Sequence, residues 1–138
     1  MEYQHKTQYY ETDQMGIIHH SNYIRWFEEA RVDFMTQCGF SYAKMEEEGV
    51  ISPVLSVSCE YKSMTHFGDT VVIETSIEKY NGVKLQLVYT VKDAQTGTVR
   101  CTGKSSHCFL DREGKVLSLK KGYESYHEKF QKAYEEKL

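Results

Sequence analysis

Hydrophobic side chains recur at spacings of three and four along residues 21–38 and at a spacing of two beyond residue 50. The first pattern predicts one long helix that begins near Ser21 and ends at Gly39. Its main apolar face consists of Tyr23, Phe27, Ala30, Phe34 and Cys38. Further apolar residues widen this face: Ile24, Trp26, Val32 and Met35. Because little of the helix is purely polar, we expect it to be covered on more than one side.

The spacing of two predicts an antiparallel series of strands. The expected strands are residues 3–9, 51–62, 71–77, 83–92, 99–110 and 116–119. Within 51–62 we expect an inward face formed by Ile51, Leu55, Val57, Cys59 and Tyr61. Asn81-Gly82 is a strong hairpin signal, because both residues tolerate positive φ. Helical spacing also predicts a short helix over residues 42–48 and a C-terminal helix over about residues 122–137.

One apolar helix followed by an antiparallel meander indicates an α+β fold, in which the sheet curls around the helix to bury it. The strand from Val99 has an unusually small face at Cys101, Gly103 and Ser105, which lets another group approach closely. At 138 residues, we expect residues 1–138 to form a single domain.

Composition excludes several classes of protein. Hydrophobic residues make up 40% of the chain and charged residues 27%, as in a folded globular protein. The net charge of -3 provides no field that attracts nucleic acid, so we expect no nucleic-acid partner. The first residues lack the apolar core expected of a secretion signal, no run of residues approaches the length of a membrane span, and the four cysteines show no CxxC spacing. We therefore expect a cytoplasmic protein with reduced thiols, although sequence leaves a disulfide open.

Residues 9–31 carry most of the candidate chemistry. Asp13 is followed by a glycine turn at Gly16 and by His19 and His20, just before the long helix begins. The first N–H groups of a helix lack internal partners and point back toward this loop. A carboxylate beside such donors can attack a carbonyl, or activate water against it, while the donors hold the developing oxyanion. The segment therefore predicts an acyl-transfer site.

Other roles for the same residues remain open. Asp13 also fits an Asx turn, the commonest role of aspartate before glycine, and His20 also fits a helix cap. His19 and His20 could bind a metal with Asp13, but no HxxxH or HxH spacing completes a ligand set, so we expect no metal site. G-x-S-x-G and the glycine-rich phosphate loops are absent. His66 and His107 are expected to be loop and strand residues with satisfied hydrogen bonds.

The spacing Tyr-x-Glu-Thr-Asp-x-x-Gly-x-x-x-His-x-x-Tyr over residues 9–23, followed by Glu28, Ala30 and Arg31, resembles the hot-dog fold acyl-CoA thioesterases. The nearest branch is the 4-hydroxybenzoyl-CoA thioesterase family with its YbgC-like members. The segment YKSMTHFGD over residues 61–69 is similar as well. The resemblance extends over about residues 3–120 and implies the hot-dog fold, in which a curved antiparallel sheet wraps around a long central helix.

The resemblance implies an acyl-CoA substrate and no separate cofactor, because coenzyme A is part of that substrate. It places the catalytic aspartate on Asp13 and the backbone N–H donor on His20. The substrate-binding candidates are Tyr9, Met15, Gly16, Ile17, Ile18 and Tyr23. Without a phosphate loop, the phosphates of coenzyme A would need scattered basic residues such as Lys62 and Lys104. The resemblance also implies a homodimer with joined sheets, or a homotetramer, with sites at the dimer interface.

Sequence does not distinguish two roles for Asp13, which would either attack the carbonyl to give a mixed anhydride or act as a general base on water. Two other functions also remain. A hot-dog hydratase or dehydratase would act on the same thioesters with a base aimed at the acyl α-carbon. A non-catalytic acyl-CoA-binding module would bind without turnover, but burying an acid without a task is costly. The acyl group itself is not specified.

Overall fold

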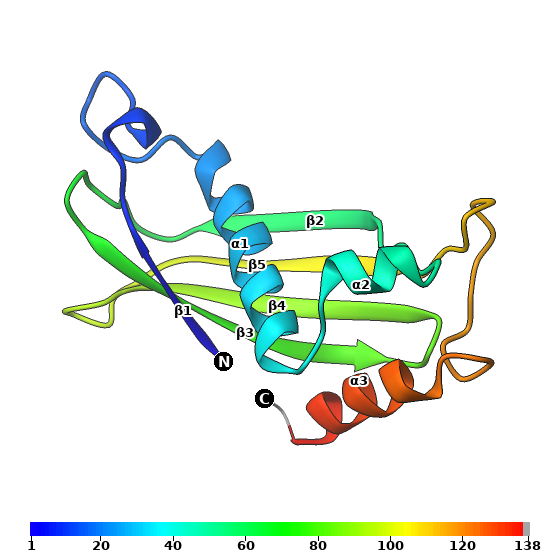
Figure 1. Cartoon of the computed structure of the whole chain (residues 1–138). Coiled ribbons are helices and arrows are strands. Elements are labelled where there is room, and N and C mark those ends of the chain that lie inside the picture. The colour runs from blue at the N-terminus through cyan, green and yellow to red at the C-terminus, as the bar shows by residue number, and fades with distance from the viewer. Residues whose placement is uncertain (137–138) are drawn as a thin grey trace.

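The computed structural model describes residues 1–136 and contains one five-stranded antiparallel sheet (Figure 1). The strands are β1 (Glu2–Lys6), β2 (Val54–Tyr61), β3 (Thr70–Tyr80), β4 (Lys84–Asp93) and β5 (Val99–Cys108). Their order across the sheet is β1-β3-β4-β5-β2, so β1 and β2 are the two edges. The predicted α+β layout is confirmed.

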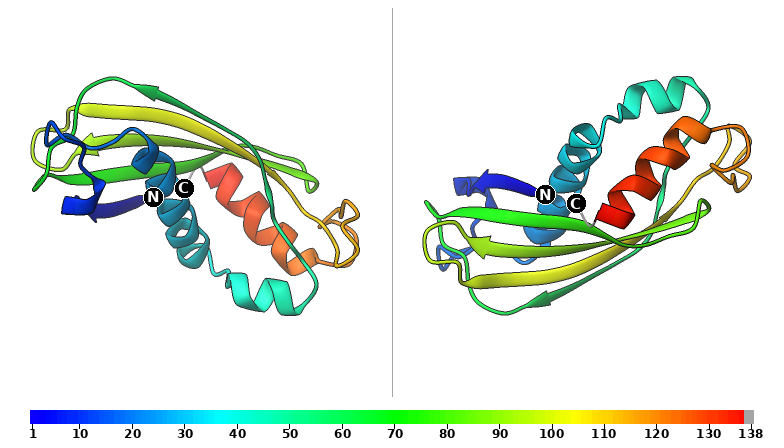
Figure 2. Two further views of the ribbon diagram at one scale, coloured as in Figure 1. Left: turned by 90° about the horizontal axis from the view of Figure 1, so that it is seen from above. Right: turned by 90° about the horizontal axis from the view of Figure 1, so that it is seen from below.

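The long helix α1 (Ser21–Gln37) packs against one face of the curved sheet, and α2 (Tyr42–Glu47) and α3 (Glu124–Glu136) lie on the same side (Figure 2). The helix was predicted to begin near Ser21 and to end at Gly39, so both predicted bounds of α1 are confirmed within two residues. Trp26, Phe27, Ala30 and Phe34 are buried against the sheet. The rest of the chain covers less of the surface of α1 than predicted, because Ile24 and Val32 remain exposed.

The small face of β5 is what lets α1 approach the sheet. A Cβ atom at Gly103 would lie 2.4 Å from Phe27 Cε2 and 2.7 Å from the Ser58 carbonyl oxygen. The Phe27 ring stacks on Tyr89 of β4 with ring centroids 4.5 Å apart. The predicted close approach at this face is confirmed, and the group that approaches is an aromatic ring of the central helix.

Three predicted strands differ from the structure. The first ends at Lys6, because residues 9–11 turn into a short 3-10 helix, η1 (Tyr9–Glu11). The strand predicted from residue 51 begins only at Val54, and its apolar side chains do not form a buried face: Leu55 is 53% exposed. An edge strand has a sheet neighbour on one side only, which explains this exposure. Residues 116–119 form no strand, and only Val116 makes an isolated bridge to Leu110.

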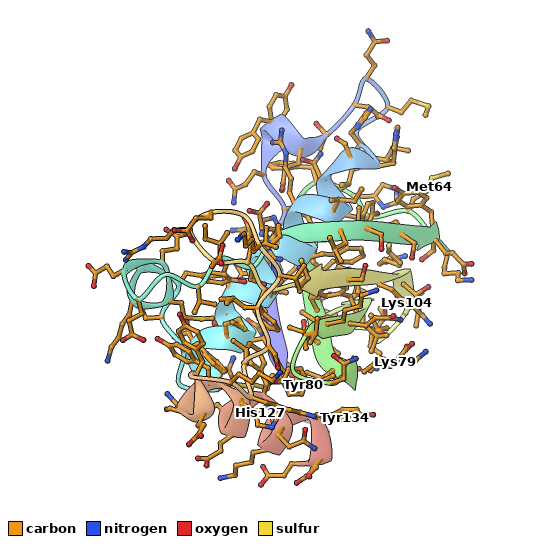
Figure 3. All side chains as sticks on the ribbon, turned by 90° about the vertical axis from the view of Figure 1, so that its right-hand side faces the viewer. Met64, Lys79, Tyr80, Lys104, His127 and Tyr134 are labelled. Atoms are coloured by element: carbon orange, nitrogen blue, oxygen red, sulfur yellow. The ribbon has the colours of Figure 1, made fainter. Side chains whose placement is uncertain are left out.

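Helix α3 closes the far end of the sheet. Its Phe130 stacks on Phe40 at 4.3 Å and packs against Tyr80 of β3. Figure 3 shows His127 of α3 facing Tyr80, and the two side chains share a hydrogen bond of 2.8 Å. The helix was predicted to reach residue 137, which lies outside the described residues. No helix within residues 1–136 is long and apolar enough to cross a membrane.

Candidate active site

Asp13 lies at the base of a tight turn. Its N–H donates to the Ile17 carbonyl at 2.8 Å, and the Gly16 N–H donates to the Asp13 carbonyl at 3.1 Å. Gly16 has a φ of 76°, a conformation that favours glycine. The half-buried carboxylate accepts a hydrogen bond from the Met15 N–H at 2.8 Å. Asp13 thus makes the Asx turn foreseen from its sequence context, and this turn fixes the direction of its carboxylate.

The turn that carries Asp13 is tied to the loop between β2 and β3. Ile17 forms a bridge with His66, and the Ile18 N–H donates to the Thr65 carbonyl at 2.8 Å. The Tyr9 ring meets the edge of the Phe67 ring with centroids 5.7 Å apart. Two segments about fifty residues apart in sequence therefore form one surface at the start of α1.

The N-terminus of α1 leaves one backbone donor free. The His19 N–H donates to the Glu11 carbonyl at 2.8 Å, and the Asn22 N–H donates to the His19 carbonyl at 3.0 Å. The Ser21 N–H uses the His19 ring as its acceptor at 3.2 Å. Within residues 1–136, the His20 N–H has no such acceptor. This amide sits at the positive end of the helix dipole and is available to an external oxygen.

A pocket of about 330 Å³ lies beside this donor. Its lining residues are Ile17, Ile18, His20, Tyr23, Tyr61, Lys62, Ser63 and Met64. The structure therefore brings together five of the residues predicted from sequence: Ile17, Ile18, His20, Tyr23 and Lys62. Tyr61 was not predicted. Its hydroxyl donates to the His20 carbonyl at 3.2 Å, and its ring lies edge-on to the His20 ring at 6.0 Å.

Four predicted residues of the turn do not line this pocket: Tyr9, Asp13, Met15 and Gly16. Tyr9 is 78% exposed and Met15 is 75% exposed, so both side chains face outward on this single chain. Tyr23 instead is buried, and its hydroxyl donates to the Thr65 hydroxyl at 2.9 Å. Burial raises the Tyr23 pKa, so the phenol is neutral and acts as a fixed part of the wall.

The two lysines predicted for coenzyme A are not neighbours in one pocket. Lys62 follows β2 at the pocket rim, and its ammonium is 3.0 Å from the Glu60 carboxylate. Lys104 is on β5, where it pairs with Glu78 at 3.1 Å. Both lysines are exposed, so each ion pair contributes little to stability. Lys62 is the one that the structure places beside His20.

Glu11 is a buried acid to which sequence assigned no role. Its carboxylate accepts from the Trp26 indole N–H at 2.7 Å, from the Gln8 N–H at 2.7 Å and from the His5 ring at 2.9 Å. Burial by itself raises the Glu11 pKa, but the hydrogen bonds from His5, Trp26 and Gln8 outweigh it, so the pKa lies below its ordinary value. The Glu11 carbonyl also accepts from the Asn22 side chain at 3.0 Å. Glu11 and Gln8 form a capping box, but glutamine is not one of the N-cap residues that mark this motif in a sequence.

A second series of hydrogen-bonded polar side chains connects α1 to β5 and β4. The Arg31 guanidinium lies 2.8 Å from His107 Nδ1, His107 Nε2 lies 2.7 Å from the Ser105 hydroxyl, and Ser105 lies 2.6 Å from the Tyr89 hydroxyl. Burial, together with the charge of Arg31, lowers the His107 pKa to about 4. Because Arg31 can only donate, His107 Nδ1 accepts and its Nε2–H donates to Ser105. The expectation of a strand histidine with satisfied hydrogen bonds is confirmed.

The described residues, 1–136, hold no group of three or more His, Cys, Asp or Glu side chains that could bind a metal ion. The His19 and His20 rings instead stack on one another with centroids 4.3 Å apart, and the His19 ring shares a hydrogen bond with the Ser21 hydroxyl.

Comparison with known proteins identifies the family. Residues 7–133 match the thioesterase-like superfamily. YneP of Bacillus subtilis (strain 168), named provisionally as an acyl-CoA thioesterase, is 38% identical over 129 residues, which is 93% of each chain. The acyl-CoA thioester hydrolase YbgC of Escherichia coli is 28% identical over 63% of this chain and 66% of its own length.

Solved structures agree with these relatives. The crystal structure of a DHNA-CoA thioesterase from Staphylococcus aureus is 33% identical and superposes with a TM-score of 0.89, covering 95% of this chain and 88% of that chain. The predicted hot-dog fold is thereby confirmed. The chain, with its curved sheet around a central helix and a free amide at the start of that helix, belongs to the thioesterase-like superfamily.

Proposed function

We propose that the protein hydrolyses acyl-CoA thioesters to a free acid and coenzyme A, with Asp13 and the His20 N–H as its catalytic groups. The observation that carries the proposal is the free His20 amide, on a residue that also lines an apolar pocket and that follows the turn holding Asp13. An acid and an oxyanion donor on one short segment are the two groups that acyl transfer requires.

The thioester carbonyl oxygen accepts a hydrogen bond from the His20 N–H, and the helix dipole stabilises the negative charge that develops on it. Asp13 then acts in one of two ways. It attacks the carbonyl carbon to form a mixed anhydride that water later cleaves, or it removes a proton from the attacking water. In both cases the C–S bond breaks, and coenzyme A leaves as a thiolate that needs no strong general acid.

The pocket supplies the contacts to the rest of the substrate. Ile17, Ile18 and Tyr23 form an apolar wall for the acyl group near the carbonyl. Met15 and Tyr9, which are exposed on the single chain, contact the acyl group from outside this wall, with Gly16 allowing its close approach. Lys62 at the rim, and Lys104 at a greater reach, bind phosphates of coenzyme A.

The edge strand β2 supports a homodimer with joined sheets. Val54, Leu55, Val57 and Tyr61 of this strand are all large and exposed. A long edge with exposed apolar side chains is a template for pairing with a second strand. We therefore propose that β2 pairs with β2 of a second copy, and that pairs of dimers form a tetramer. Sedimentation of wild type beside a Val57→Lys variant tests this, and an unchanged mass would contradict it.

Release of free thiol from a panel of short, long and aromatic acyl-CoAs tests the activity, with Asp13→Asn beside the wild type. This variant preserves the shape of the side chain while removing its basicity, so turnover should fall by roughly 10²- to 10⁴-fold with folding intact. Near-wild-type turnover in the variant would refute the role of Asp13. Binding without thiol release would indicate a binding module, and a hydrated product without thiol release would indicate a hydratase.

A further inference from the structure

Two of the four cysteines meet across neighbouring strands. Cys59 of β2 and Cys101 of β5 have their sulfur atoms 3.0 Å apart, although they are 42 residues apart in sequence. In the strand register Cys59 is opposite Gly103 and Cys101 is opposite Tyr61, so the two cysteines are diagonal neighbours on the same face.

The other two cysteines provide a contrast within the same chain. Cys38 follows the end of α1, and Cys108 ends β5. Within residues 1–136 neither of them has a sulfur neighbour at hydrogen-bond distance, and all four cysteines are free thiols. The close sulfur pair is therefore specific to Cys59 and Cys101.

The two thiols differ in access to solvent. Cys101 is buried, whereas Cys59 on the edge strand is half-buried. Burial raises the pKa of the Cys101 thiol, and the neighbouring Cys59 raises it further, so Cys101 stays protonated. Cys59 is thus the sulfur that a small oxidant meets first, and Cys101 is held within reach behind it.

We infer that Cys59 and Cys101 form a peroxide-reactive dithiol, a modification site that closes to a disulfide between β2 and β5. The Cys59 sulfur attacks one oxygen of hydrogen peroxide, the O–O bond breaks, and one water leaves to give a sulfenic acid. The Cys101 sulfur attacks the Cys59 sulfur, the S–O bond breaks, and a second water leaves with the Cys101 proton. Two thiols are oxidised to one disulfide while peroxide is reduced to two waters, and an added thiol reverses the change.

A disulfide holds its sulfurs about 2 Å apart, so the two sulfurs must approach by about one ångström. Diagonal strand neighbours have Cα atoms about 7–8 Å apart, so the two strands must also draw slightly together. Within the single chain β2 is hydrogen-bonded to β5 alone, and Cys59 and Cys101 lie on this one pair of strands, so the disulfide would form within one chain. The disulfide would lie next to the candidate pocket. Tyr61 is opposite Cys101 in the strand register, lines that pocket, and donates a hydrogen bond to the His20 carbonyl.

The test treats the full-length protein with hydrogen peroxide, alkylates the remaining thiols under denaturing conditions with N-ethylmaleimide, and measures the intact mass. We expect two alkylated thiols in place of four, a loss of two hydrogen atoms, and a linked peptide pair that contains Cys59 and Cys101. Four alkylated thiols, or a link through Cys38 or Cys108, would overturn the inference.

Matched single substitutions supply the control. Cys38→Ser and Cys108→Ser should each still form the linked pair. Cys59→Ser should keep three alkylatable thiols, whereas Cys101→Ser should keep two and carry added oxygen on Cys59, because no second thiol displaces it. The primary measurement is the intact mass of the wild-type protein, so the test does not depend on whether a variant at a buried cysteine folds. It also needs no substrate, so its outcome is separate from the proposed thioesterase activity.

Discussion

The Trp26 indole N–H donates to the Glu11 carboxylate over 2.7 Å in the protein interior. Glu11 lies two residues before Asp13, and Trp26 lies in the second turn of α1. The Glu11 carbonyl meanwhile accepts from the His19 N–H, one residue before His20. Glu11 therefore sets the position of the acid-bearing turn relative to the free amide of the helix.

Replacing Glu11 by Gln should lower both activity and stability. The amide group cannot accept all the donors that converge on this site, which leaves at least one of them buried without a partner. We expect kcat to fall at least about tenfold, because a small misplacement of reacting groups is costly, and the free energy of unfolding to fall by about 2–3 kcal/mol. Steady-state kinetics and urea unfolding measure the two effects.

Trp26→Phe is the matched control for Glu11→Gln, since it removes one donor while keeping an aromatic ring. It should produce a smaller loss of the same kind, on the order of 1 kcal/mol in stability. If Glu11→Gln loses stability but retains the full kcat, Glu11 supports the fold without positioning Asp13.

Two substitutions at one position separate the His20 amide from the His20 ring. His20 has a φ of -56°, which proline can adopt, and proline lacks the N–H. His20→Pro should therefore reduce kcat by roughly 10²- to 10³-fold, the usual cost of losing an oxyanion donor. His20→Ala retains the amide and should stay within about tenfold of wild type. Equal losses in the two variants would assign the function to the ring instead.

Gly103→Ala should destabilise the protein by about 1–3 kcal/mol. The added Cβ atom would lie 2.4 Å from the Phe27 ring and 2.7 Å from the Ser58 carbonyl oxygen, and the ring is itself held against Tyr89. Thermal unfolding measures the effect. Ser58→Ala, an exposed change in the paired strand, serves as the control and should stay within about 0.5 kcal/mol of wild type.

His107 should make the protein less stable in mild acid. Burial beside Arg31 lowers its folded-state pKa to about 4, whereas the unfolded chain takes up the proton near pH 6.5. Between these values only the unfolded state is protonated, so stability present above about pH 6.5 is lost as the pH falls toward 4. Urea unfolding from pH 7 to pH 4 measures this loss. His107→Gln has no such group and should show a shallower decline, while a parallel decline would exclude His107 as its source.

The sequence allowed the central helix and the meander to be predicted because their patterns are local. Spacings of three and four over residues 21–38 and the turn at Asn81-Gly82 determine these elements without any long-range information. The position of β2 could not be read in this way. The alternation of apolar and polar residues distinguishes the two faces of a strand, but burial of either face depends on where the strand lies in the sheet. β2 is an edge strand, and most of its side chains are exposed.

The candidate site was predictable only in part, for a similar reason. Asp13 and His20 lie within one segment whose spacing is legible in sequence. Tyr61 comes from the end of β2, and only the folded chain brings its hydroxyl to the His20 carbonyl. The contact between Cys59 and Cys101 also depends on strand register, which no cysteine spacing reveals.

The wall of the pocket is built from two separate segments that meet through the bridge between Ile17 and His66. The segment before α1 carries the proposed reacting groups, Asp13 and His20, while residues 61–64 line the pocket and include Lys62, which we propose to bind coenzyme A. Substrate preference can therefore drift during evolution through changes at the second segment, with the chemistry of bond cleavage left untouched.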